Sequence, residues 1–165
     1  MAAPCIDPEL IAHAEHVVAA LKQAGSTVVT AESCTAGLLA AVLSHVEGAG
    51  DVLHGSFVTY SKANKSAALG VDPELLRRAG SVNAEVVRQL ARGALERSPA
   101  DLAIAVSGVL GPKPDEDGNP VGLVYFCCCS RHGELRVERR DFGAQGDDVL
   151  RRAAILEALR LLAEP

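Results

Sequence analysis

The sequence is poor in aromatic residues and carries no excess of positive charge. Phe, Tyr and Trp make up 3% of the 165 residues, Trp is absent, and the formal net charge is −5. A platform for single-stranded nucleic acid needs stacked aromatic side chains, and a protein that binds DNA or RNA needs a basic surface. We therefore expect no nucleic acid among the partners of this chain.

Long apolar runs are missing as well. No segment approaches the roughly 20 apolar residues of a membrane span, and the first residues, Met-Ala-Ala-Pro-Cys, lack the basic and apolar regions of a secretory signal. Three of the five cysteines are consecutive, at 127–129, and neighbouring strand residues face opposite sides, which excludes a disulfide framework. We expect reduced thiols in a cytoplasmic protein that does not contact a membrane.

Metal-ligand spacing and nucleotide fingerprints are also absent. The histidines at 13, 16, 45, 54 and 132 form no pair with a Glu on one helix face, and no Walker or dinucleotide glycine motif is present. The cysteine triplet has no second cluster that would complete a zinc site, and small core side chains are the better interpretation. We expect neither a metal nor a cofactor.

Apolar periodicity predicts a single α/β domain over residues 1–165. Asp7-Pro8 is a helix start signal and Gly25 a stop signal. Helices are predicted over 8–24, 35–45, 62–69, from 72 onward, around 86–94 and over 149–162. Strands are predicted over 26–30, 52–60, 102–106, 121–129 and 134–142, with a long loop over 108–122. Helices and strands alternate first and a hairpin comes late, which predicts a layered domain with a mixed sheet.

Three segments place small polar side chains where a strand ends. In the first, Thr30-Ala31-Glu32-Ser33-Cys34-Thr35-Ala36-Gly37, a strand leads into a helix whose first N–H groups could hold a phosphate or an oxyanion beside Ser33. The alternative is that Ser33 and Thr35 only cap the helix. Cys34 is a second candidate nucleophile, because a thiol pKa falls at a helix start.

The second segment runs from Tyr60 to Lys65, and the third from Val106 to Pro112. A desolvated lysine can serve as the base for a serine nucleophile, whereas the alternative leaves Lys62 and Lys65 in solvent. Glycines in the third segment allow a ligand to approach the backbone, or they simply form the exit from a strand. The acidic residues 115–117 could bind a cation, but a solvated loop is the simpler interpretation.

Taken together, these residues resemble the CinA C-terminal domain family. The octapeptide at 30–37 is similar to the family signature TAESCTGG, and the resemblance continues through Val58-Thr59-Tyr60, Lys65, Gly80-Ser81-Val82, Ser107-Gly108 and Pro120-Val121-Gly122. It implies a three-layer α/β/α sandwich, usually oligomeric, in a stand-alone form without the additional N-terminal domain of many members. It also implies hydrolysis of the carboxamide of nicotinamide mononucleotide in pyridine nucleotide salvage.

The resemblance assigns roles to individual positions of this chain. Ser33 is the expected nucleophile, with Lys65 as base and Tyr60 in the same network, while Glu32 would orient the turn. Substrate contacts are expected from Glu32, Cys34, Thr35, Ala36, Gly37, Ser107, Gly108 and Gly111.

Four departures from the family pattern concern substrate preference more than fold. Ala36 replaces a glycine and Ser107 a threonine, the loop 111–120 differs from the usual GPDGG, and Asp148 occupies the arginine position of a Gly-Asp-Arg motif. The lost arginine removes a charge that could hold a phosphate or an interface. A site that binds a nucleotide without turnover, as a sensor or interaction module, is therefore the alternative.

Overall fold

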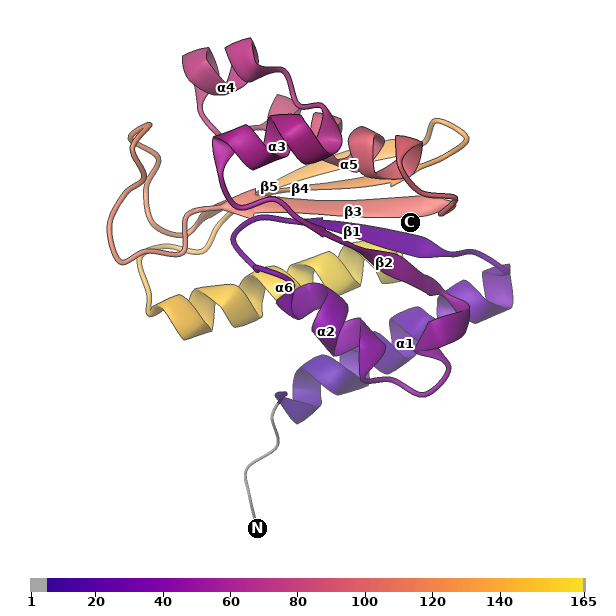
Figure 1. Ribbon diagram of the computed structural model, residues 1–165. Helices are drawn as coiled ribbons and strands as arrows, with labels where there is room; N and C mark the ends of the chain where they lie inside the picture. The colour runs from indigo at the N-terminus through magenta and orange to yellow at the C-terminus, as the bar shows by residue number, and fades with distance from the viewer. Residues whose placement is uncertain (1–5, 165) are drawn as a thin grey trace.

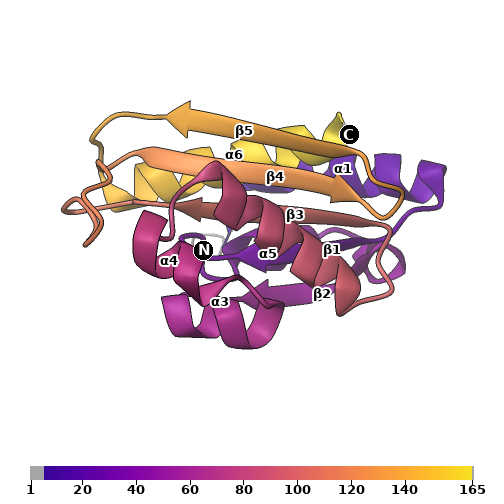
Figure 2. The same ribbon diagram turned by 90° about the horizontal axis from the view of Figure 1, so that it is seen from above.

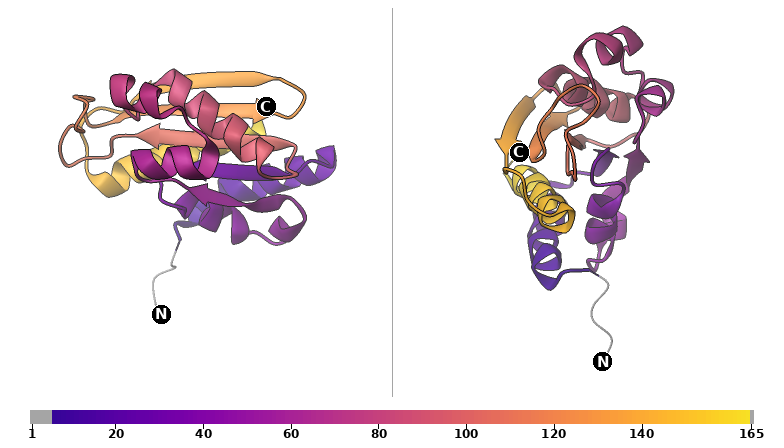
Figure 3. Two further views of the ribbon diagram at one scale, coloured as in Figure 1. Left: turned by 45° about the horizontal axis from the view of Figure 1, so that its top comes forward. Right: turned by 90° about the vertical axis from the view of Figure 1, so that its left-hand side faces the viewer.

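Helices cover both faces of one five-stranded sheet (Figures 1 and 3). The computed structural model describes residues 6–164. The strands are β1 (Val28–Glu32), β2 (Leu53–Val58), β3 (Leu102–Gly108), β4 (Leu123–Ser130) and β5 (Leu135–Asp141). Their order is β2-β1-β3-β4-β5, as Figure 2 shows from above. The first three strands in this order are parallel, and β4 and β5 run antiparallel to their neighbours, which confirms the predicted mixed sheet.

The helices form two layers, and the expected three-layer α/β/α sandwich is confirmed. One face carries α1 (Pro8–Ala24), α2 (Leu38–Ser44) and α6 (Asp147–Ala163). The other face carries α3 (Lys62–Leu69), α4 (Pro73–Ala79) and α5 (Ala84–Glu96), and a short 3-10 turn, η1, spans Ala49–Asp51. Within residues 6–164, no helix has the length and apolar character needed to cross a membrane.

Residues 1–5 and 165 lie outside the described part of the chain. The inferred lack of a secretory signal rests partly on these N-terminal residues, and Cys5 is among them. The assignment of residues 1–165 to a single domain therefore stays a prediction.

Local signals fix the helix ends as the sequence indicates. The Asp7 carboxylate accepts the Glu9 N–H at 2.8 Å at the start of α1, and Gly25 adopts a left-handed conformation with φ +63° at its end. The Ser61 hydroxyl accepts the Asn64 N–H at 3.1 Å and so caps α3. Capping satisfies N–H groups that have no partner inside the helix.

The cysteine triplet lies in the core on both sides of the sheet. Cys128 packs with the α1, α2 and α6 layer, whereas Cys127 and Cys129 pack with the α5 layer. Each of these thiols, and that of Cys34, is buried and free. This alternation follows from the two-residue period of a strand and fits the expected role as small core side chains.

Several element boundaries differ from the prediction by one to three residues, and two of the shifted starts have a local cause. β1 begins at Val28 rather than 26, because the Thr27 N–H and hydroxyl both donate to Asp101 Oδ2, at 2.8 and 2.9 Å. α2 begins at Leu38 rather than 35, because Ala36 and Gly37 are left-handed, with φ of +50° and +92°. Residues 33–37 therefore form a turn that places its side chains differently from a helix.

A close approach of α5 to α3 involves Gly93. A Cβ atom at this position would lie 2.0 Å from the Leu69 carbonyl oxygen. Only glycine allows the two helices to pack this closely. The packing holds α3, which carries Lys65, against α5, and α5 in turn packs on the sheet.

Candidate active site

The carboxyl ends of the three parallel strands lie level at one edge of the sheet. Glu32 at the end of β1 is in register with Val58 of β2 and with Val106 of β3. The Ser33 N–H donates to the Val106 carbonyl at 3.0 Å, and the Thr59 N–H donates to the Glu32 carbonyl at 2.8 Å. The residues that follow the three strands are therefore neighbours, at the place where open α/β sheets bind ligands.

Lys65 is fully buried and points back from α3 to this edge. Its Nζ lies 2.8 Å from Ser33 Oγ and donates to the carbonyl oxygens of Thr59 and Tyr60, at 2.7 and 3.0 Å. Burial lowers the pKa of Lys65 from its ordinary 10.5 to about 8, because desolvation disfavours the charged amine. The alternative of a solvated Lys65 is excluded.

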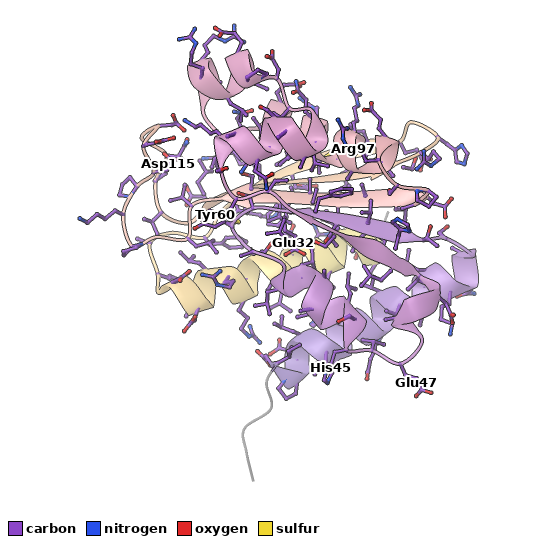
Figure 4. The ribbon with its side chains drawn as sticks, viewed as in Figure 1. Glu32, His45, Glu47, Tyr60, Arg97 and Asp115 are labelled. Carbon is purple, nitrogen blue, oxygen red and sulfur yellow. The ribbon has the colours of Figure 1, made fainter. Side chains whose placement is uncertain are left out.

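Ser33 and Glu32 are chain neighbours that face opposite layers. The Ser33 hydroxyl meets α3, whereas the Glu32 carboxylate lies against the start of α2 (Figure 4). Glu32 is completely buried and accepts the N–H groups of Gly37, Leu39 and Ala40, at 3.0, 3.1 and 2.9 Å. It also accepts the Thr35 hydroxyl at 2.7 Å. The carboxylate thus fixes the turn from inside the protein.

This arrangement corrects the expectation for the first N–H groups after β1. The Gly37 N–H is occupied by Glu32, and the Ala36 N–H donates to the Ser33 carbonyl at 3.1 Å. Within residues 6–164, the N–H groups of Cys34 and Thr35 donate to no other residue. The anion-binding amides predicted over 34–37 therefore reduce to these two.

A cavity of about 400 Å³ opens at Ser33 and Lys65, a size that is ordinary for small-molecule sites. Seven of the residues predicted for the site line it: Ser33, Cys34, Tyr60, Lys65, Ser107, Gly108 and Gly111. Glu32, Thr35, Ala36 and Gly37 do not line this cavity, and the substrate contacts expected from them stay a prediction. Thr35 and the Gly37 amide are held by the buried Glu32 carboxylate instead.

Tyr60 contributes to the site through its backbone. Its carbonyl oxygen accepts Lys65 Nζ, while its side chain is 72% exposed at the cavity entrance. Figure 4 shows Tyr60 at the same end of the sheet as Asp115. No described partner of Lys65 is the Tyr60 hydroxyl, so the expected shared network runs through the carbonyl.

Ser107 connects the end of β3 with the turn before α5. Its hydroxyl is buried and donates to the Ser81 carbonyl at 2.8 Å. Ser81 and Val82 line the cavity as a result. The hydroxyl that Ser107 shares with the threonine of the family pattern thus shapes the cavity wall.

Cys34 has the opposite character to the one expected at a helix start. Burial raises the pKa of the Cys34 thiol to about 12, because its surroundings disfavour the thiolate. The carbonyl of Cys34 accepts a hydrogen bond from Arg151 Nη1 at 3.2 Å. Cys34 is therefore a protonated thiol beside Ser33, and the hypothesis that it attacks loses its basis.

Several cavity residues are not among the residues predicted for the site. They are Ser81, Val82, Leu110, the acidic residues 115–117, Asp147 and Arg151. The resemblance at Gly80-Ser81-Val82 pointed to two of them, whereas the acidic run gave no sign that it would fold toward the site. Arg151 lies within a helix predicted only from its apolar periodicity. In the described chain, no group of three or more His, Cys, Asp or Glu side chains could hold a metal ion.

The family described as the CinA C-terminal domain matches residues 11–165. This chain belongs to that family. A nicotinamide-nucleotide amidohydrolase, PncC, of Escherichia coli K12 is 40% identical over 156 residues, which are 94% of each chain. A CinA-like protein of Akkermansia muciniphila is 45% identical over 122 residues, which are 74% of this chain and 30% of that one.

Solved structures agree with this assignment. The competence/damage inducible protein CihA of Agrobacterium tumefaciens has a TM-score of 0.92 at 34% identity, with 97% of each chain covered. The resemblance found in the sequence is confirmed, and the names of the full-length relatives confirm the expected enzyme class, amidohydrolase.

Proposed function

We propose that this CinA-family chain hydrolyses the carboxamide of nicotinamide mononucleotide to nicotinate mononucleotide and ammonia, with Ser33 as nucleophile and Lys65 as base. The observation that carries the proposal is the 2.8 Å contact between Ser33 Oγ and a buried Lys65 Nζ at the wall of the cavity. The amidohydrolase named for a nicotinamide nucleotide among the relatives supports the substrate. The products would enter pyridine nucleotide salvage in the cytoplasm.

The partners of Lys65 suit a base that starts each cycle neutral. A neutral amine has two N–H groups and one lone pair, and the carbonyls of Thr59 and Tyr60 accept both N–H groups. The lone pair is then left for the proton of the Ser33 hydroxyl. With a pKa of about 8, a useful fraction of the amine is neutral near pH 7.

The first half of the reaction forms an acyl-enzyme. Lys65 Nζ takes the hydroxyl proton as Ser33 Oγ bonds to the carboxamide carbon, and the carbonyl π electrons move to oxygen. The N–H groups of Cys34 and Thr35 are the donors available to this oxyanion. When the carbonyl re-forms, the C–N bond breaks, and Lys65 returns its proton to the leaving nitrogen, which departs as ammonia.

The second half restores the serine. A water molecule gives a proton to Lys65 and bonds to the acyl carbon, and the ester bond to Ser33 breaks as the carbonyl re-forms. Ser33 Oγ takes the proton back from Lys65. One water is consumed, and one carboxylic acid, which ionises in solution, and one ammonia are formed.

The substrate contributes to this chemistry through its pyridinium ring. A fixed positive charge near Lys65 disfavours the ammonium form of the amine. The same charge draws electrons from the carboxamide and makes its carbon easier to attack. The proposed substrate therefore strengthens the base and activates the carbonyl together.

Ammonia release from nicotinamide mononucleotide by the purified protein tests the proposal, with Ser33→Ala as the matched variant. We expect release by the wild type that the variant loses. If the folded wild type releases no ammonia, the proposed activity is wrong. Retained binding of the nucleotide in that case would identify a binding module instead.

A further inference from the structure

Arg151, on the second turn of α6, lines the same cavity as Ser33. Its Nη1 donates to the Cys34 carbonyl at 3.2 Å, which places the guanidinium one residue from the proposed nucleophile. Its Nη2 lies 2.7 and 2.8 Å from the two carboxylate oxygens of Asp147. The arginine is therefore anchored to the catalytic turn and to its own helix.

The cations at the cavity wall differ in what they are free to do. Among the described lining residues, Lys65 and Arg151 are the two cationic ones. Lys65 Nζ is committed to Ser33 and to two backbone carbonyls. Arg151 therefore remains as the one lining cation available to a charged group of the substrate.

Arg151 also has N–H groups that no described residue accepts. A guanidinium has five N–H groups, and the contacts with Cys34 and Asp147 use three of them. Within the described chain, Nε–H and one Nη1–H have no acceptor. The parallel Nε–H and Nη2–H groups of a guanidinium fit two oxygens of a phosphate, so bidentate binding at Arg151 uses Nε–H together with the Nη2–H that Asp147 holds. Asp147 is 53% exposed, and an exposed ion pair of this kind is weak enough for a phosphate dianion to displace.

The remaining walls repel a phosphate. The loop residues Asp115, Glu116 and Asp117 line the cavity, and the last two are paired with Lys62 on α3. Figure 1 shows the segment between β3 and β4 beside α3 and α4, and the start of α6 on the opposite side. An anionic group in the cavity is therefore expected at Arg151 on α6, where it displaces the Asp147 carboxylate.

We propose that Arg151 binds the phosphate of the nucleotide and so sets where the carboxamide meets Ser33. This assignment rests on the proposed function, which supplies the phosphate-bearing substrate. Residues three apart share one helix face, so Arg151 brings a cation to the face on which Asp148 places a carboxylate. The Gly-Asp-Arg motif of the family, in which Asp148 occupies the arginine position, had suggested that this positive charge is missing from the chain.

The test compares nicotinamide mononucleotide with nicotinamide riboside, which differs only by the phosphate. For Arg151→Ala we expect kcat/KM on the mononucleotide to fall about 10- to 100-fold, mainly through KM, as for a lost hydrogen bond to a charged group. The riboside value should change by less than about threefold, because no phosphate contact is lost. Arg160→Ala, the same charge change near the other end of α6, should leave both values in place.

Asp147→Asn supplies a variant with the opposite expected sign. It removes the carboxylate that competes for the guanidinium, so KM for the mononucleotide should fall while KM for the riboside stays. Equal losses on both substrates in Arg151→Ala would mean that Arg151 only holds the Cys34 turn, and would overturn the proposal. An unchanged ratio of kcat/KM for the mononucleotide to kcat/KM for the riboside in Arg151→Ala would likewise overturn the proposal.

Binding separates this proposal from the proposed catalysis. Calorimetric Kd values for both compounds are measured in Ser33→Ala and in Ser33→Ala/Arg151→Ala. A preference for the phosphate that disappears with Arg151 supports the phosphate site even if the wild type releases no ammonia. A preference that survives the loss of Arg151 overturns it even if turnover is normal.

Discussion

Lys65 Nζ lies 2.8 Å from Ser33 Oγ, although 32 residues separate them and they come from a sheet edge and a covering helix. The contact is possible in both protonation states of the amine. An ammonium donates to all three oxygens, whereas a neutral amine donates to the two carbonyls and accepts from Ser33. Proton transfer therefore reverses one hydrogen bond and leaves the heavy atoms in place.

Replacing the proposed nucleophile, Ser33, and its neighbour Cys34 in turn distinguishes the two candidate groups. Ser33→Ala should lower kcat by about 10⁴-fold or more, as the loss of an enzyme nucleophile does. Cys34→Ala should change kcat by less than about threefold, because a thiol with its pKa raised to about 12 is not a nucleophile at neutral pH. The rate of ammonia release measures kcat for both variants. A loss of activity in Cys34→Ala but not in Ser33→Ala would identify Cys34 as the nucleophile.

Activity should depend on the titration of Lys65. The neutral amine is the active form, so kcat/KM should rise with pH and level off above about pH 8. In the complex, the pyridinium cation lowers the pKa of Lys65 further, which shifts the acidic limb of kcat to lower pH. The pH profiles of kcat and kcat/KM check this, and coincident acidic limbs would contradict the role of the substrate charge.

Stability should depend on the same amine. Between pH 8 and 10.5 the unfolded chain keeps the Lys65 proton and the folded chain has released it. The unfolded state then binds more protons, so the free energy of unfolding rises with pH, by roughly 3 kcal/mol across the window. Urea unfolding of Lys65→Met should lack this rise.

The comparison with Lys65→Met is needed because the buried thiols lower the free energy of unfolding as the pH rises, whereas Lys65 raises it. Burial raises the pKa of Cys34 and Cys127 from 9.0 to about 12, so above pH 9 the folded chain holds protons that the unfolded chain loses. Both proteins share this decrease in stability. The difference between their curves reports the titration of Lys65 together with its charge interaction with Cys34, and parallel curves would show that the pKa of Lys65 is not lowered.

Glu32→Gln should weaken the turn without changing its shape. In the glutamine side chain an NH2 group replaces one carboxylate oxygen. This NH2 group cannot accept hydrogen bonds from the backbone N–H groups that the oxygen bound. We expect a loss of about 3 kcal/mol in the free energy of unfolding, together with a lower kcat. Thr35→Val removes a single donor to the same carboxylate and should lose only about 1 kcal/mol. Equal urea midpoints for wild type and Glu32→Gln would refute the anchoring role.

Ala36→Gly should stabilise the protein. Ala36 has φ +50° and is exposed, and this conformation costs an L-residue with a side chain roughly 1 to 2 kcal/mol. The extra freedom of glycine in the unfolded chain offsets about 0.4 to 1 kcal/mol, which leaves a net gain. Ala40→Gly, inside α2, should instead lose about 1 kcal/mol. Chemical denaturation gives the sign of the change in the free energy of unfolding for each variant. Destabilisation by Ala36→Gly would contradict the backbone strain assigned to Ala36.

The sequence alone predicts the layers, the mixed sheet and the residues of the Ser33–Lys65 pair. These follow from local signals, such as apolar periodicity and caps, and from the resemblance of the octapeptide. The octapeptide does not reveal that Glu32 and Ser33 serve different layers, since that depends on where β1 ends. An end shifted by two residues, from 30 to Glu32, decides which side chains reach the cavity.

The positions of Arg151 and of the acidic residues 115–117 at the cavity could not be predicted from the sequence, for a different reason. Both enter the cavity through long-range packing, with Arg151 bound to the Cys34 carbonyl 117 residues away and Asp117 bound to Lys62 55 residues away. Neither contact leaves a periodic or motif signature in the chain. The predicted oligomer and cytoplasmic location stay predictions.

The anchored carboxylate of Glu32 has a thermodynamic consequence for every reaction cycle. Residues 33–40 lose their conformational entropy when the chain folds, because three amides and a hydroxyl in this segment are already bound to Glu32. No such loss then remains for the step in which Ser33 attacks. The activation entropy of the chemical step should therefore reflect the ordering of the substrate and of water, with the protein contributing little.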